Sequence, residues 1–296
     1  MNKSLTVIIP VSKYEKIETI QNSIKHFLSL DYTGFDWNVV YCIDKQDNNY
    51  DLQTLDNIEI CWVKNNNIRQ SGNYNAGLDK FPDSDYYAFF DLDGFPEKYF
   101  FQKCKKVDAD FVTGNSYIRN SNINSITKTI SETYEIGNYW KKLSFNMSKM
   151  YYPAACCGLI KGKVFKNFRF SNPTLPDNEL YMHIINNKYS MGYLENTYYT
   201  DLSVTTIKEV YKQNIRWKIE TLKNRKIKIF DWIGVVFPIS QFLLFPVSIK
   251  FIKHIKGYNL FFHLIFMIFV SKIAIIKFIL GSGFKWTSSE KIEHCQ

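Results

Sequence analysis

The sequence predicts an α/β protein whose central sheet is mostly parallel and carries helices on both faces. Apolar segments of strand length alternate with segments of helical period, which is the rhythm of repeated βαβ units. The chain has 296 residues, 46% of them hydrophobic and 17% aromatic, so a large core is available. Two of the predicted strands end in aspartate, and in such sheets ligands bind beyond the carboxyl ends of the strands.

The individual elements follow from short patterns taken in chain order. The first strand, LTVIIP at 5–10, is an apolar run that Pro10 ends. β-Branched and aromatic runs predict three further strands, and helical periodicity predicts four helices. These are strands at 37–44, 58–63 and 85–91, and helices at about 14–30, 71–81, 176–188 and 206–226. The stretch from about 114 to 152 is polar and Asn/Ser-rich, and no element is assigned to it.

Charge is distributed unevenly along the chain. Residues 1–207 carry 22 Lys and Arg against 23 Asp and Glu, whereas residues 208–296 carry 15 against 5. All of the excess positive charge therefore lies in the last third, together with the longest apolar runs. This division is not that of a nucleic-acid-binding surface, but it suits an anionic membrane face. We expect a main domain at 1–226, a basic membrane-associated region at 227–296, and no nucleic-acid partner.

Two apolar runs, at 232–249 and 258–271, dominate the C-terminal region. Basic residues flank both, which favours hydrophobic helices that lie in or dip into the cytoplasmic interface of a membrane. Two membrane-spanning helices are the alternative, although Pro238 and Pro246 would kink the first. The N-terminus lacks the features of a signal peptide, and the six cysteines form no C-x-x-C pair. We expect reduced cysteines and a protein at the cytoplasmic face of the cell membrane.

The segment FFDLDGFPEK at 89–98 places Asp91 and Asp93 directly after an apolar strand. Two carboxylates there repel each other and lose hydration unless a cation joins them. Mg²⁺ or Mn²⁺ suits the pair, since Mg²⁺ takes one or two protein carboxylates and completes its shell with phosphate oxygens. A solvated turn permitted by Gly94 is the simpler alternative. Asp44, at the end of the second strand, can accept hydrogen bonds from a base or ribose.

Taken in order, several motifs resemble those of glycosyltransferase family 2, whose members have the A-type, Rossmann-like nucleotide-sugar fold. VIIPVS resembles the first strand and nucleotide loop, CIDKQDNN the base-binding loop, and Asn75-x-Gly77 and Asp91-Leu92-Asp93 the R-N-x-G and D-x-D elements. PAACCGLIKGKVF, LPDNEL and QNIRW resemble the acceptor-side strand, the catalytic-base segment and the Q-x-x-R-W of membrane-bound polysaccharide synthases. The resemblance covers about residues 5–225 and departs from the family pattern at Tyr74 and Pro176.

The resemblance implies a role for each matching residue. Asp177 would be the catalytic base, and Asp91 and Asp93 would hold Mg²⁺ or Mn²⁺. The remaining residues would contact the substrates. Those that would bind the nucleotide-diphosphate sugar donor are Pro10, Asp44, Asn75, Asp91 and Arg216. Those that would face the acceptor or the donor sugar are Gln213, Trp217, Glu179 and Gly158.

Together these parts imply an inverting, metal-dependent glycosyltransferase that acts in cell-surface polysaccharide or glycolipid synthesis. The donor would be a nucleotide-diphosphate sugar, with a UDP-sugar favoured, and the acceptor a hydroxyl of a lipid-linked or other membrane-linked glycan. One alternative is a processive polysaccharide synthase subunit, which Q-x-x-R-W allows. Another is a nucleotide-sugar-binding membrane protein that has lost catalysis, which the departures at Tyr74 and Pro176 allow.

Overall fold

The computed structural model describes residues 2–44, 55–63, 69–151, 156–171, 175–223, 269–270, 273 and 276. The chain forms two compact units. The first consists of Met1–Tyr117 and Asn138–Asp201, and the second of Ile118–Gly137 and Leu202–Gln296. The domain boundary predicted at residue 226 falls outside the described residues and stays a prediction.

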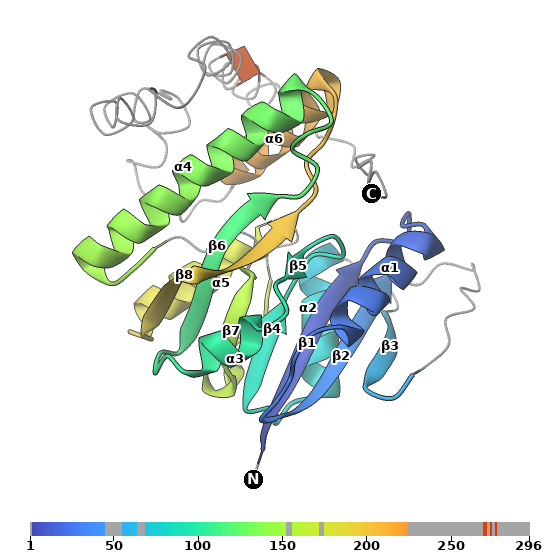
Figure 1. Cartoon of the computed structure of the whole chain (residues 1–296), viewed down its shortest axis with the longest axis vertical. Coiled ribbons are helices and arrows are strands. Elements are labelled where there is room, and N and C mark those ends of the chain that lie inside the picture. The colour runs from blue at the N-terminus through green and yellow to red at the C-terminus, as the bar shows by residue number, and fades with distance from the viewer. Residues whose placement is uncertain are drawn as a thin grey trace. The chain divides into compact units, whose positions relative to one another are not determined.

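The first unit is built on a sheet of eight strands, shown in Figure 1. The strands are β1 Lys3–Val11, β2 Phe35–Asp44, β3 Ile58–Val63, β4 Tyr86–Phe89, β5 Phe95–Pro96, β6 Phe111–Ile118, β7 Gly158–Lys161 and β8 Met191–Asp201. The labelled helices of the described residues are α1 Ile17–Leu28, α2 Arg69–Lys80, α3 Phe100–Lys105, α4 Ser125–Ser148, α5 Pro176–Asn186 and α6 Ile207–Lys223, with a short 3₁₀ helix at Gly162–Phe165.

The sheet is mixed, with the strand order β3-β2-β1-β4-β7-β6-β8-β5. Strands β3, β2, β1 and β4 run parallel to one another, whereas β7 is antiparallel to both β4 and β6, and β5 is antiparallel to β8. The prediction of a mostly parallel sheet is therefore wrong. The repeated βαβ units end at β4. Strand β7 lies between β4 and β6 and is antiparallel to both, so it needs no helical crossover of the kind that joins parallel strands.

Each face of the sheet packs against helices of its own. On β1 the side chains alternate, so Leu5, Val7 and Ile9 join the core that also holds residues of α1 and α3, while Ile8 joins the core that holds residues of α2 and α5. Both cores are rich in fully buried aromatic side chains. The prediction of helices on both faces is confirmed.

Most predicted elements of the first unit are confirmed to within a few residues. The strands at 5–10, 37–44, 58–63 and 85–91 correspond to β1 to β4, and the helices at 14–30, 71–81 and 176–188 correspond to α1, α2 and α5. The stretch from 114 to 152, to which no element was assigned, contains the second half of β6 and the 24 residues of α4. Its apolar positions are too sparse to reveal the helix, which has a polar, part-exposed surface.

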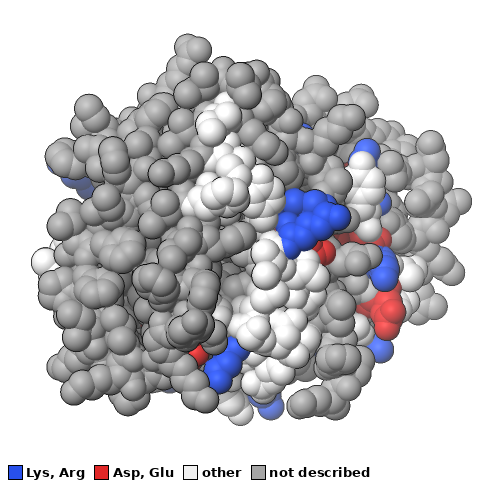
Figure 2. All heavy atoms as spheres, turned by 90° about the horizontal axis from the view of Figure 1, so that it is seen from above, with Lys and Arg blue, Asp and Glu red and all other residues white. Residues whose placement is uncertain are grey.

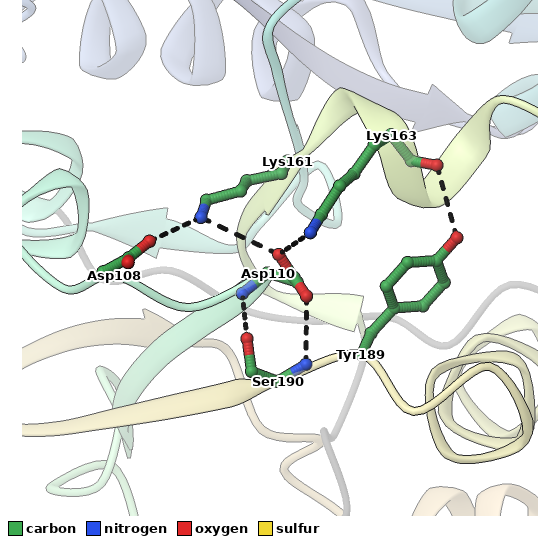
Figure 3. Close-up of polar contacts among 6 residues, drawn as sticks. All are labelled: Asp108, Asp110, Lys161, Lys163, Tyr189 and Ser190. Carbon is green, nitrogen blue, oxygen red and sulfur yellow. Dashed lines mark hydrogen bonds and ion pairs between the residues drawn. The ribbon is translucent and has the colours of Figure 1, made fainter.

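A polar cluster ties three strands together at the end of the sheet opposite Asp91 (Figure 3). Asp110, just before β6, accepts hydrogen bonds or ion pairs from Lys163 Nζ at 2.7 Å and from the backbone N–H of Ser190 at 3.1 Å. Lys161, the last residue of β7, pairs with Asp108 at 2.7 Å. The cluster fixes the starts of β6 and β8 against the end of β7, which sets the register of the antiparallel half.

The second unit contains α6, the first half of α4 and the connection after β8. Asn120 anchors that connection, since its side chain donates to Ser203 O and accepts from Ser203 N–H, both at 2.8 Å. Ile215 and Ile219 of α6 pack with Val270 in a small buried cluster. The predicted helix at 206–226 is confirmed as α6.

The predicted C-terminal hydrophobic helices fall almost wholly outside the described residues. Within the part of the chain that the structure describes, no helix is both long enough and apolar enough to cross a membrane. On the face drawn in Figure 2, the described Lys and Arg side chains lie among both uncharged and acidic ones. The predicted basic membrane surface thus rests on the sequence of residues 227–296.

Candidate active site

Three predicted donor-binding residues lie at the carboxyl edge of the parallel half of the sheet. The register pairs Pro10 of β1 with Cys42 of β2, two residues before Asp44. On the other side of β1, Ile8 pairs with Phe89, two residues before Asp91. Pro10, Asp44 and Asp91 therefore lie at the same ends of three neighbouring strands, as expected from the sequence.

The D-x-D segment forms a tight turn after β4. The backbone N–H of Gly94 donates to Asp91 O at 2.8 Å. A Cβ at Gly94 would lie 3.1 and 3.2 Å from backbone atoms of Asp91, so the turn has little room for a side chain. Asp91 Oδ1 accepts a hydrogen bond of 2.8 Å from the amide of Gln70 at the start of α2. The turn and this bond together fix the direction of the Asp91 carboxylate.

Tyr74 occupies the position where the family pattern has arginine, and it is a core residue. Its side chain is completely buried against Phe89 and Phe170, and its hydroxyl accepts a 2.9 Å hydrogen bond from Gln70. Burial, with the nearby charge of Asp91, raises the pKa of Tyr74. Tyr74 thus supports Gln70, which in turn holds Asp91, and it stays uncharged at physiological pH.

Asn75 holds another segment of the protein in place. Its side chain donates to Phe170 O at 2.8 Å and accepts from Phe170 N–H at 2.9 Å, so both ends of the amide are engaged. Asn73, two residues earlier, donates to Val11 O at the end of β1 with a distance of 3.3 Å. Asn73, which lies just before the motif, thus contacts the end of β1, and sequence reasoning missed it.

Two adjacent buried cysteines, Cys156 and Cys157, lie directly before β7. Cys157 bridges to Phe89, at the end of β4. Burial raises the pKa of Cys156, and the carboxylates of Asp177, Asp91 and Glu179 raise it further. The D-x-D turn and the first turn of α5 therefore both lie near enough to the Cys156 thiol to affect its pKa.

Helix α5 begins with Pro176 at its first position, which suits a residue that has no N–H to donate. Asp177 follows in the first turn, where a carboxylate interacts favourably with the helix dipole. Glu179 accepts hydrogen bonds from Ser171 N–H at 2.8 Å and from Ser171 Oγ at 2.5 Å. Both carboxylate oxygens of Glu179 therefore hold Ser171, and the role of catalytic base given to Asp177 stays a prediction.

A further acid, Asp201, lies beside the D-x-D turn. It ends β8, whose Thr200 pairs with Phe95 of β5, and its Oδ1 lies 3.4 Å from where a Cβ of Gly94 would be. Sequence reasoning missed Asp201. Strand β8 was not predicted because the segment at 191–200 mixes polar and aromatic residues, so no pattern marked Asp201 as the end of a strand. The structure thus adds a carboxylate from the antiparallel half to the edge of the site.

Lys141 of α4 lies close to Asp201 and Cys157. It donates to Gly114 O and to Ser116 Oγ, both at 3.2 Å. Burial lowers the pKa of Lys141 to about 8, against the opposing effects of the Cys157 and Asp201 side chains. The antiparallel half therefore holds a cation as well as an acid at this side of the site, and neither was predicted.

Gly158, predicted to face a sugar, has a packing reason to be glycine. A Cβ there would lie 2.7 Å from Val112 O and 2.8 Å from the ring of Phe111. Strand β7 can approach β6 only because position 158 carries no side chain. A contact of its backbone with a sugar stays a prediction.

The donor set around the turn consists of carboxylate oxygens, which are the ligands that Mg²⁺ and Mn²⁺ prefer. Among the described residues, no three His, Cys, Asp or Glu side chains gather closely enough to form a metal cage. A site made of Asp91 and Asp93 needs no cage, because a nucleotide diphosphate and water complete the coordination of Mg²⁺. The residues present therefore fit a divalent ion that binds together with its nucleotide.

The predicted Q-x-x-R-W residues lie on α6 of the second unit. Gln213 and Arg216 are partly buried, and Trp217 is 43% exposed. Trp217 is thus not the core residue that an ordinary amphipathic helix would bury. The structure brings together Asp91, Asp177 and Glu179 of the first unit, whereas the roles given to these three α6 residues stay predictions.

No family model matches the chain, and no curated protein matches it in sequence. Among solved structures, the mannosyltransferase PcManGT from Pyrobaculum calidifontis, in complex with GDP-Man and Mn²⁺, is similar with a TM-score of 0.59 and 12% identity over 96% of this chain and 89% of that one. TarS residues 1–349 from S. aureus, in complex with UDP-GlcNAc, is similar with a TM-score of 0.48 and 15% identity over 77% of this chain and 68% of that one. The TarS comparison, with a TM-score below 0.5, carries no weight in the fold assignment, which rests on the similarity to the mannosyltransferase. The chain has the fold of a nucleotide-sugar glycosyltransferase.

Proposed function

We propose that the chain is an inverting glycosyltransferase that moves a sugar from a nucleotide-diphosphate sugar to a hydroxyl of a membrane-linked glycan. One observation carries the proposal. In a fold shared with a mannosyltransferase, the D-x-D turn follows β4 at the carboxyl edge of the parallel strands, and Gln70 holds Asp91 Oδ1 there at 2.8 Å. The carboxylate that would orient the donor is thus fixed at the edge where ligands bind in such sheets.

The parallel half of the sheet would bind the donor. Asp44 would hold the base, and Asp91, fixed by Gln70, would face the ribose or the metal. Asp93 would be the second carboxylate for a divalent ion. When bound, such an ion stabilises the negative charge that develops on the leaving diphosphate. The mannosyltransferase of similar fold is in complex with GDP-Man and Mn²⁺, which supports this use of a metal. A UDP-sugar stays the predicted donor, and a GDP-sugar is the alternative.

Asp177 would accept the proton of the acceptor hydroxyl as that oxygen attacks the anomeric carbon. Attack from the face opposite the diphosphate inverts the anomeric configuration. General-base assistance of this kind is worth roughly 10²–10⁴-fold in rate. Glu179 is the competing candidate; both of its carboxylate oxygens bind Ser171, and the activities of Asp177→Asn and Glu179→Gln decide between the two.

The membrane part of the proposal rests on sequence. Arg216 would contact the diphosphate, since its planar fork suits phosphate oxygens, and the exposed Trp217 would offer a flat face to a sugar ring. The basic, apolar residues 227–296 would keep the enzyme at the cytoplasmic face of the membrane, where a lipid-linked acceptor is concentrated.

A panel of nucleotide sugars, with and without Mn²⁺, tests the proposal. We expect one nucleotide-diphosphate sugar to be hydrolysed slowly, with release of the nucleotide diphosphate. Addition of membrane lipid-linked glycans should accelerate that release, because the sugar is then transferred to the glycan. Binding of a donor without hydrolysis or transfer under any condition would instead favour the non-catalytic binding protein. Repeated addition of sugar to one acceptor chain would favour the processive synthase.

A further inference from the structure

Two cysteines face each other on neighbouring strands at the edge of the sheet. The parallel register of β2 and β3 pairs Cys42 directly with Cys61. Cys42 belongs to the core on the α2 face, and Cys61 packs against the same core. Neighbouring strands lie about 4.8 Å apart, which is within the range of Cα separations, about 4.4–6.8 Å, that a disulfide spans. The two thiols therefore lie on one face and within bonding reach of each other.

The two thiols differ in exposure and in their surroundings. Cys42 is fully buried, whereas Cys61 lies on the edge strand and is partly exposed. At the end of α2, Lys80 forms a 2.5 Å ion pair with Glu59, two residues before Cys61. Residues two apart on a strand point to the same face, so the Glu59–Lys80 pair lies on the side of the strand that carries the Cys61 sulfur.

The electrostatics of the pair favour a thiolate on Cys61. A hydrogen bond with the Cys42 thiol and the charge of Lys80 lower the pKa of Cys61 to about 7, against burial and the charge of Glu59. The same hydrogen bond and burial raise the pKa of Cys42. Burial also raises the pKa of each remaining described cysteine, namely Cys104, Cys156 and Cys157. Among the described cysteines, Cys61 is therefore the one suited to react at neutral pH.

We propose that Cys61 and Cys42 form a peroxide-reactive site in which Cys61 is the attacking thiolate and Cys42 the resolving thiol. This proposal stands on the register, the burial difference and the Lys80 contact, and does not depend on the glycosyltransferase assignment. Its substrate class is hydrogen peroxide or a small organic hydroperoxide.

The chemistry balances in two steps. The Cys61 thiolate attacks one peroxide oxygen, the O–O bond breaks, and hydroxide leaves and takes up a proton to form water, so that Cys61 becomes a sulfenic acid. The Cys42 sulfur then attacks the Cys61 sulfur, the S–O bond breaks, and a second water leaves. Overall two thiols are oxidised to one disulfide by two electrons, and one hydrogen peroxide is reduced to two waters. The product links edge strand β3 covalently to β2.

The first experiment uses the full-length chain with Cys295→Ser, because Cys295 lies outside the described residues. The reduced protein is treated with limiting hydrogen peroxide at pH 7.4 and then digested without reductant. We expect one linked peptide pair containing Cys42 and Cys61, and a mass lower by two hydrogen atoms. Cys42→Ser should give a sulfenic acid on Cys61 that a dimedone probe traps, and Cys61→Ser should give neither product. Cys104→Ser, the matched control, should behave as the parent.

The second experiment measures the rate at which iodoacetamide alkylates each cysteine at pH 7.4. We expect Cys61 to react at least about tenfold faster than Cys104, because a buried thiol of raised pKa is neither accessible nor ionised. Lys80→Gln should slow Cys61 by a few fold, and Glu59→Gln should accelerate it, since the two charges act in opposite directions. A disulfide at other cysteines, equal alkylation of Cys61 and Cys104, or the same change in both charge variants would overturn the proposal.

Discussion

The two halves of the sheet differ in direction, in origin along the chain and in what they bring to the site. The parallel half, β3-β2-β1-β4, is formed by residues 3–89 and ends in Pro10, Asp44 and the D-x-D turn. The other half contains the antiparallel strand β7 and leads to Asp177, Glu179 and Asp201. Donor binding and acceptor activation are therefore expected to be separable, because different halves of the molecule supply them.

The largest effect is expected from Asp93→Ala in the parallel half. Loss of this carboxylate should remove the metal dependence of nucleotide binding and lower transfer by at least about 10²-fold, since one charge-stabilising contact at a leaving group is worth that much. Calorimetry with UDP, GDP and dTDP, each with Mn²⁺ and with EDTA, provides the measurement. Tight binding of every nucleotide by the unaltered protein in EDTA would refute a metal site at the turn.

The next largest effect is expected from Asp177→Asn in the other half. The variant should lose roughly 10²–10⁴-fold in kcat, because it lacks the base that takes the acceptor proton. Glu179→Gln is the matched control and should mainly lower stability, by about 1–2 kcal/mol, through a weakened bond to Ser171. Steady-state transfer and thermal unfolding of both variants distinguish these effects. An inactive Glu179→Gln beside an active Asp177→Asn would reverse the two roles.

The difference between the halves also explains how far the sequence was informative. In the parallel half, β1 and β4 are almost wholly buried and appear as apolar runs such as LTVIIP. Strands β2 and β3 are less buried but are rich in β-branched and aromatic residues, so β1 to β4 could all be predicted. In the other half β7 has only four residues and β5 two. Strand β8, MGYLENTYYTD, mixes polar and aromatic residues because several of its positions are exposed. Strands of this kind carry too weak a pattern to be found.

The same contrast applies to the candidate site. The positions of Asp44, Asp91 and Asp93 at strand ends could be predicted, because each ends or closely follows a recognisable strand; their roles stay predictions. Asp201 and Lys141 could not, because their places depend on the pairing of β8 with β5 and on the packing of α4, which only the folded chain shows. Gln70 and Asn73 were missed because the motif pointed to Asn75 as the donor-binding residue. The side chain of Asn75 binds the backbone of Phe170.

A smaller effect, on stability alone, is expected where β6 meets β8. A Cβ at Gly114 would lie 2.2 Å from Thr197 O, so Gly114→Ala should destabilise the first unit by about 2–4 kcal/mol. At Gly137 of α4 a Cβ meets no described atom within 4 Å, and Gly137→Ala should stabilise by up to about 1 kcal/mol. Urea unfolding of the two variants tests the close contact, and equal stability of both would contradict the β6–β8 packing.

The smallest expected effect concerns the buried cation, Lys141. Its folded-state pKa of about 8 lies below the ordinary 10.5, so the unfolded chain binds more protons between these values and the folded state gains stability as the pH rises through them. Lys141→Met should therefore be more stable than the parent at pH 7, by about 1–2 kcal/mol, with the difference shrinking toward pH 10. Urea unfolding at both pH values gives the comparison. A variant less stable at pH 7 would mean that the bonds to Gly114 and Ser116 outweigh the cost of burial.

The most direct test of the separation between the halves is a calorimetric titration of the intact donor, in Mn²⁺, into Asp177→Asn and Asp93→Ala beside the unaltered protein. The donor is the nucleotide sugar that the panel identifies. Asp177→Asn should bind it within a few fold of the parent affinity while transferring no sugar, whereas Asp93→Ala should lose the binding itself. Loss of donor binding in Asp177→Asn, to the same degree as in Asp93→Ala, would contradict the assignment of acceptor activation to α5 and donor binding to the parallel strands.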